Sequence, residues 1–95
     1  MDLAELQVFL TVASERSFSK AAARLHRTQP AVSQAIRRLE DHLGERLFDR
    51  AAKDGKLTEA GRVLLDYAQR LMRLAEEADS AVRELRDLQR GRVLV

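Results

Sequence analysis

The sequence predicts a mainly α-helical protein with three short helices, a small β-hairpin and one long helix after the hairpin. Three observations favour this fold class. Apolar residues recur every three or four positions over most of the 95 residues. Turn signals, notably Gly44 and the pair Asp54-Gly55, separate the periodic segments. From residue 59 onward the apolar pattern becomes a heptad repeat without proline.

Composition limits the possible classes of protein. The formal net charge is only +2, and there is no cysteine, which removes disulfides and thiolate chemistry and fits a reducing compartment. The first ten residues, MDLAELQVFL, carry acids where a signal peptide carries positive charge, and no apolar run reaches membrane length. We therefore expect a soluble protein of the cytoplasm with no membrane partner.

Residues 2–15 show helical apolar spacing and predict the first helix. Ser17 is a natural N-cap for a short second helix that begins with Phe18. Thr28 or Gln29 caps the third helix. Pro30 lies in its first turn, where backbone amides have no hydrogen-bond partner within the helix, so the missing amide hydrogen of proline costs nothing. The third helix buries a stripe of apolar side chains and stops at Gly44; the stripe is Val32, Ile36, Leu39 and Leu43.

The second helix and the third helix as far as Leu39 carry charge of one sign. No Asp or Glu occurs between Glu15 and Glu40, whereas the same stretch holds six basic residues: Arg16, Lys20, Arg24, Arg27, Arg37 and Arg38. A solvated helix face normally mixes both signs, so this run predicts a surface for an anionic partner such as nucleic acid.

One face of the third helix has the side chains that read base edges. Pro30, Ser33, Gln34 and Arg37 follow at i, i+3, i+4 and i+7 and so project together near the helix N-terminus. Gln and Arg offer paired groups that suit adenine and guanine, and proline can pack on a thymine methyl. The arrangement predicts a helix-turn-helix, at about residues 18–37, whose third helix enters the major groove.

The segment after Gly44 predicts a small hairpin, or wing. Leu47 and Phe48 precede the turn dipeptide Asp54-Gly55, and the chain then returns through Leu57. Three cations, Arg50, Lys53 and Lys56, would stand near its tip, suited to phosphates or a narrow minor groove. A solvated loop is the alternative.

Residues 59–89 predict a helix of about 45 Å, too long for so small a domain. Its apolar residues alternate four and three apart as a heptad seam that should meet another chain; the seam is Leu64, Ala68, Leu71, Ala75, Ala78, Val82 and Leu85. The alternative is that the seam folds back on its own domain. Parallel and antiparallel pairing both remain open.

The segments RLHRTQPAVSQAIRRLEDHLGERLFDR and LTEAGRVLL resemble the N-terminal DNA-binding domain and linker helix of the LysR-type transcriptional regulators. The resemblance implies a winged helix-turn-helix, a homodimer through the linker helix, usually antiparallel, and binding to interrupted palindromes in promoter DNA. It assigns base reading to Gln29, Pro30, Ser33, Gln34 and Arg37. It assigns backbone contacts to Thr28, Arg50, Lys53 and Thr58.

In this family an effector-binding domain follows the linker helix. We expect a DNA-binding domain over 1–58, a linker and dimerisation helix over 59–89, and a hinge over 90–95. Gly91 should break the long helix, and Arg92–Val95 should open a β-strand of the next domain. No cofactor is expected within these residues, and a small-molecule effector of unknown identity is expected for the full-length protein.

Neither an enzyme nor a metal site is expected, because the chain offers only His26 and His42, no cysteine and no phosphate-binding glycine loop. The serious alternative is a helical interaction and dimerisation module without specific DNA binding, since the seam alone would suit one.

Overall fold

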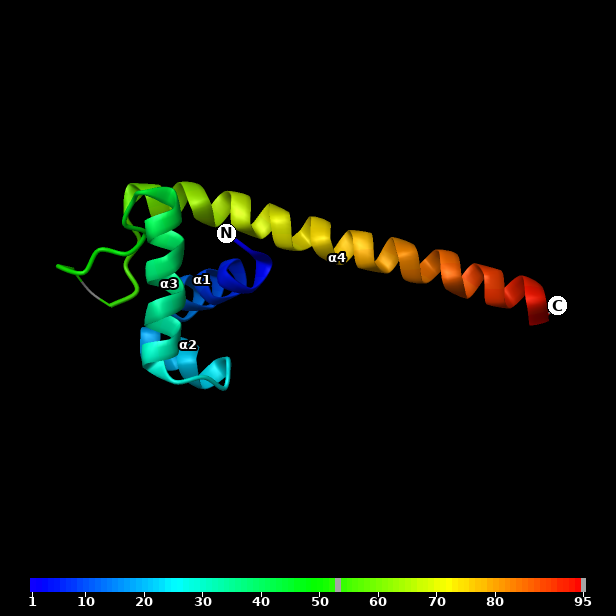
Figure 1. The fold of residues 1–95 in the computed structure, drawn as a ribbon, viewed down its shortest axis with the longest axis horizontal. Helices are drawn as coiled ribbons and strands as arrows, with labels where there is room; N and C mark the ends of the chain where they lie inside the picture. The colour runs from blue at the N-terminus through cyan, green and yellow to red at the C-terminus, as the bar shows by residue number, and fades with distance from the viewer. Residues whose placement is uncertain (53, 95) are drawn as a thin grey trace.

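The structure, a computed structural model, describes residues 1–52 and 54–94, with side chains described as far as residue 90. It contains four helices, α1 (Leu3–Glu15), α2 (Phe18–Arg24), α3 (Gln29–Leu43) and α4 (Glu59–Leu94). Figure 1 shows α1, α2 and α3 gathered into one body, from which α4 projects. The molecule is therefore elongated, with extents of 62 × 25 × 19 Å.

Side chains at the helix starts confirm the predicted caps. The Ser17 hydroxyl accepts the Lys20 amide at 3.1 Å, and the Thr28 hydroxyl accepts the Ala31 amide at 3.2 Å. Asp2, which was not predicted as a cap, does the same for α1 through the Glu5 amide. Gly44 ends α3 in the left-handed conformation, with φ of 71°. These caps are local, which is why the sequence alone could place them.

The core of the body is built around three aromatic rings. Phe48 packs against Phe9 at 5.5 Å and against Phe18 at 5.3 Å between ring centroids. Fully buried aliphatic side chains from α1 and α3 surround the rings: Val8, Val12, Val32, Ile36 and Leu39. Each such side chain contributes about 1.5 to 3 kcal/mol on burial, so this cluster fixes α3 against α1.

The segment between α3 and α4, residues 45–58, is called the α3–α4 loop here. The predicted β-hairpin is absent over its described residues, which hold only one isolated bridge, between Phe48 and Leu57. Beyond this bridge the two chain segments stay paired for one more residue, since the Asp49 amide donates to the Lys56 carbonyl. The Asp49 carboxylate then accepts the Ala51 amide and so turns the chain. This side-chain turn competes with ladder pairing and ends it.

The end of α4 also differs from the prediction. The helix does not stop at Gly91 and continues to Leu94, so residues 92–94 do not open a strand; Val95 lies outside the described residues. A glycine costs a helix only about 1 kcal/mol relative to alanine. A strand also needs a hydrogen-bonding neighbour, and none lies beside this segment among the described residues.

Candidate nucleic-acid interface

The N-terminal half of α3 presents the predicted reading face. Gln29, Pro30, Gln34 and Arg37 are exposed and Ser33 is half-buried, while Val32 and Ile36 on the opposite side are fully buried. Burial of that opposite side fixes the rotation of α3, so its polar face must point outward. This end of α3 lies on the side of the body away from α4 and is open to a large partner (Figure 1).

The structure divides the basic residues into two groups. Arg24 pairs with Glu15 at 2.9 Å, and Arg38 pairs with Glu5 at 3.4 Å. Among the residues that the structure describes, Arg37 forms no ion pair, and neither do Arg16, Lys20 and Arg27. The acids that neutralise Arg24 and Arg38 come from α1, so the sequence of α2 and α3 gave no sign of them. Arg37, beside Gln34, is left free for an anionic partner.

The two threonines assigned to backbone contacts have different environments. Thr58 donates its hydroxyl hydrogen to the Arg46 carbonyl at 2.6 Å and accepts the Gly61 amide at 3.0 Å. Because a hydroxyl has a single hydrogen, Thr58 has none left for a phosphate, and its role is to cap α4. The exposed Thr28 only accepts, from Ala31, so its hydrogen remains available to a phosphate oxygen.

The α3–α4 loop is tied to the helices that carry the interface. The Phe18 amide donates to the Asp54 carboxylate at 3.2 Å, and a β carbon on Gly55 would overlap the backbone of Arg16. Sequence reasoning treated Asp54-Gly55 only as a turn signal and missed that it anchors the loop to the α1–α2 corner. Lys53 lies outside the described residues.

Arg50 was predicted to contact the DNA backbone. In the structure its guanidinium donates to Glu40 at 3.3 Å and lies over the ring of Phe18, 5.4 Å from the centroid. The side chain is 40% exposed, so it has both internal partners and an open side.

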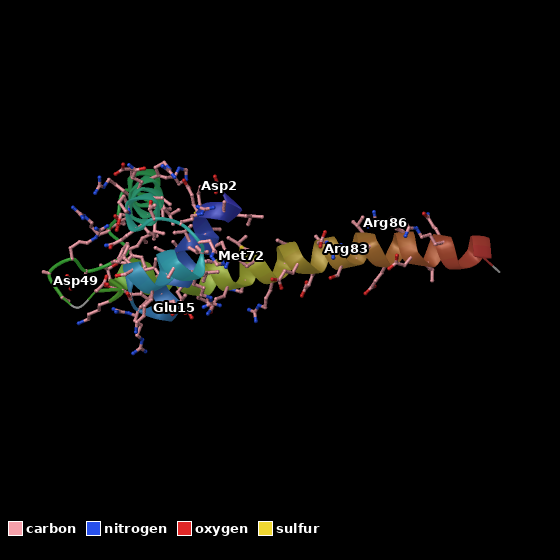
Figure 2. All side chains as sticks on the ribbon, turned by 90° about the horizontal axis from the view of Figure 1, so that it is seen from below. Asp2, Glu15, Asp49, Met72, Arg83 and Arg86 are labelled. Carbon is pink, nitrogen blue, oxygen red and sulfur yellow. The ribbon has the colours of Figure 1, made fainter. Side chains whose placement is uncertain are left out.

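The predicted seam on α4 belongs to two different surfaces. Leu64 and Ala68 are 9% and 0% exposed because they pack in the core of their own domain, so Ala68 has no surface left for a second chain. Figure 2 shows Met72 where the body ends, and Arg83 and Arg86 on the part of α4 beyond it. The alternative that the seam folds back on its own domain is thus correct for its first two residues.

A second stripe, rotated from the core-facing side by about a third of a turn, stays apolar and exposed along α4. We call it the outer stripe; it comprises Val63, Tyr67, Leu71, Leu74, Ala78, Ala81, Leu85 and Leu88. Leu71, Ala78 and Leu85 were in the predicted seam, whereas the other five residues of the outer stripe were missed: Val63, Tyr67, Leu74, Ala81 and Leu88. Ala75 is half-buried, and Val82 is exposed beside the stripe.

The outer stripe begins in an apolar groove of about 680 Å³ between α4, the end of α3 and the N-terminus. Leu43 lines this groove and is 38% exposed, so it does not belong to the buried stripe in which the sequence placed it. Arg70 donates to Asp66 at 2.7 Å and stacks on Tyr67, which lines the groove. The hydrogen bond to Asp66 and then the charge of that carboxylate raise the pKa of Arg70 above its ordinary value.

Comparison with known proteins identifies the family. The model of the bacterial regulatory helix-turn-helix proteins of the lysR family matches residues 3–62. The chain belongs to the lysR family. It is 48% identical over 98% of its length to an uncharacterized HTH-type transcriptional regulator, encoded in the ibpB-leuC intergenic region of Azotobacter vinelandii.

Two solved structures of this family are similar to the whole arrangement of α1 to α4. The BenM DNA-binding domain in complex with catB site 1 DNA has a TM-score of 0.86 and 34% identity, covering 90% of this chain and 96% of that one. Vibrio fischeri DarR in complex with DNA has a TM-score of 0.87 and 36% identity over 93% of this chain. The chain spans 65% of the length of the Azotobacter relative and 30% of DarR.

Two kinds of feature are absent from the described part of the chain. It contains no group of three or more histidine or acidic side chains placed to hold a metal ion. None of its helices combines the length and the apolar character that crossing a membrane requires.

Proposed function

We propose that the chain is the sequence-specific DNA-binding part of a transcription regulator. The N-terminal half of α3 enters the major groove of a promoter site, and the α3–α4 loop lies on the flanking backbone or minor groove. One observation carries this proposal: Gln34 and Arg37 are both exposed on the reading face, and Arg37 has no carboxylate partner among the described residues. The DNA complexes of BenM and DarR support it.

The test is base discrimination by single variants. Gln34→Ala and Arg37→Ala should each reduce the preference for a selected site over random duplex DNA by about 1 to 3 kcal/mol, because each loses a bidentate base contact. Arg38→Ala is the matched control: it removes the same charge from the neighbouring residue, whose partner is Glu5. Competition binding at fixed salt gives the ratios, and equal preferences in all three variants would contradict the assignment.

The alternative function is a helical interaction module that dimerises without reading DNA. A mobility shift with random duplex DNA at low salt separates the two functions. A DNA-binding domain should shift the duplex through phosphate contacts that weaken as salt rises. A pure dimeriser has no reason to bind at all, and failure to shift any duplex would favour that module.

We further propose that two copies pair through the outer stripe, with their α4 helices antiparallel. The body covers α4 only as far as Met72, so the distal half of the stripe has no neighbour among the described residues of its own chain. In an antiparallel pair, Leu85 and Leu88 of one copy would lie over the apolar groove of the other. A parallel pair would leave both distal halves far from either groove.

The heptad pattern of the outer stripe fits this orientation. Antiparallel layers place Leu71 of one chain against Ala81 of the other, and Leu74 against Ala78, so in these two layers a large side chain meets a small one. Arg70 then flanks Glu84 of the partner with opposite charge. Tyr67 lies opposite Leu85 in the outermost of these layers.

Cysteine variants test the orientation cleanly because the chain has no native cysteine. We expect a short thiol-specific cross-linker to join Tyr67→Cys to Leu85→Cys when the two variants are mixed. Neither variant alone should be joined to itself. Parallel pairing predicts the reverse, with each variant joined to its own copy and no mixed product.

We also propose a regulatory rather than a catalytic role, in keeping with a family of transcription regulators. The full-length protein would bind a small-molecule effector outside residues 1–95, without a cofactor in this part. A promoter-binding protein works where the chromosome lies, so we place it in the cytoplasm, at the nucleoid.

A further inference from the structure

Glu40 is the only charged side chain that is buried among those the structure describes; it is 6% exposed. It lies on α3, four residues before Gly44, and both of its carboxylate oxygens are used. Oε2 accepts the Leu47 amide at 2.8 Å and Oε1 accepts the Arg50 guanidinium at 3.3 Å. A buried carboxylate is stable only when it is paired in this way, so Glu40 joins α3 to the α3–α4 loop at two points.

The second partner of Arg50 is the face of the Phe18 ring, which belongs to α2. That ring is itself held, since it packs edge-on against Phe48. The Arg50 side chain is thus held between α3 and α2. Only one of its five N–H donors goes to Glu40, and the remainder can bind an anion.

Arg50 also lines the same hollow as Arg37, the last residue of the reading face. Arg37, Arg46 and Arg50 line one open polar hollow of about 550 Å³, whose walls also include the acids Glu40, Asp41 and Glu45. A phosphate held by Arg50 would therefore lie a set distance from the bases that Arg37 reads. When a long side chain is already held in place before binding, it loses less conformational entropy on binding a phosphate.

We propose that Glu40 is a positioning residue for DNA binding: it holds Arg50 in the place where that guanidinium grips a backbone phosphate in register with the reading face of α3. The inference rests on the proposed function. The competing role of Glu40 is simple neutralisation, in which its negative charge only weakens the pull of Arg50 on phosphate. The two roles predict opposite signs when the charge is removed.

The test is a double-mutant cycle on DNA binding with Glu40→Gln, Arg50→Ala and the double variant. The amide of Glu40→Gln keeps an acceptor for the Leu47 amide, so the loop attachment should survive. Positioning predicts that Glu40→Gln binds the selected site roughly three- to tenfold more weakly. The double variant should bind no more weakly than Arg50→Ala alone, because Glu40 acts through Arg50. Tighter binding by Glu40→Gln, or losses that simply multiply, would overturn the inference.

Arg50→Lys provides a second measurement on an exposed residue that does not threaten folding. It keeps the charge but loses the planar fork and the stack on Phe18. Positioning predicts that it binds about as weakly as Arg50→Ala, and binding equal to that of the parent would overturn the inference. If the Arg50 variants bind the selected site as well as the parent does, while Arg37→Ala loses its preference for that site over random DNA, this inference fails and the proposed function stands. A parent protein that binds no DNA would overturn both.

Discussion

Leu74→Glu should convert the paired protein to monomers and lower its affinity for a two-half-site operator by roughly 100-fold or more. Leu74 is 62% exposed within its own chain, so replacing it leaves the core of the body intact. In the proposed pair it is buried against Ala78 of the partner, where an unpaired carboxylate is far costlier than in water. Each monomer would keep its reading face. It would lose the high effective concentration with which a dimer, once bound to one half-site, binds the second.

Sedimentation at micromolar concentration measures the first effect, and binding to one and to two half-sites measures the second. Ser80→Glu is the matched control, since it adds the same charge to an exposed position on α4 outside the outer stripe. It should sediment like the parent. A Leu74→Glu protein that still sediments as a dimer would show that the outer stripe is not the interface.

Gly61→Ala should destabilise the domain, although alanine normally stabilises a helix relative to glycine by about 1 kcal/mol. Gly61 lies in the first turn of α4, where the backbone of the α3–α4 loop crosses closely. A β carbon there would overlap the Leu47 carbonyl oxygen and lie 2.9 Å from a methyl of Leu57. Relieving that overlap must move either α4 or the loop.

We expect Gly61→Ala to lose about 1 to 3 kcal/mol of the free energy of unfolding. Each kcal/mol lowers the melting temperature by about 4 to 8 °C in a domain of this size. Thermal unfolding at fixed protein concentration measures the change. A higher melting temperature than that of the parent would mean that helix propensity outweighs the contact with Leu47.

Features set by local chemistry were predictable from the sequence. Ser17, Thr28 and Gly44 act on residues within one turn, so their capping roles needed no tertiary information. The reading face followed from helical periodicity alone, because apolar Val32 and Ile36 dictate where Gln34 and Arg37 must point. The four helices were predictable for the same reason.

Features set by how the elements meet were not predictable. Whether Ala68 faces the core or a partner depends on the direction in which α4 leaves the body, and periodicity does not encode that direction. The pairing of Arg38 with Glu5 spans 33 residues of sequence. Thr58 matched a family motif, yet its hydroxyl caps α4 and holds the Arg46 carbonyl. The loop departs from a hairpin because Asp49 forms a turn of its own.

Selection of bound duplexes from a random DNA pool tests the central claim most directly, namely that α3 reads base sequence as part of a pair. We predict one enriched motif made of two inverted half-sites at fixed spacing, because a two-fold pair presents two copies of the same reading face. Bound duplexes without a shared motif, retained only at low salt, would contradict the claim and leave a cationic surface that grips phosphates without reading bases.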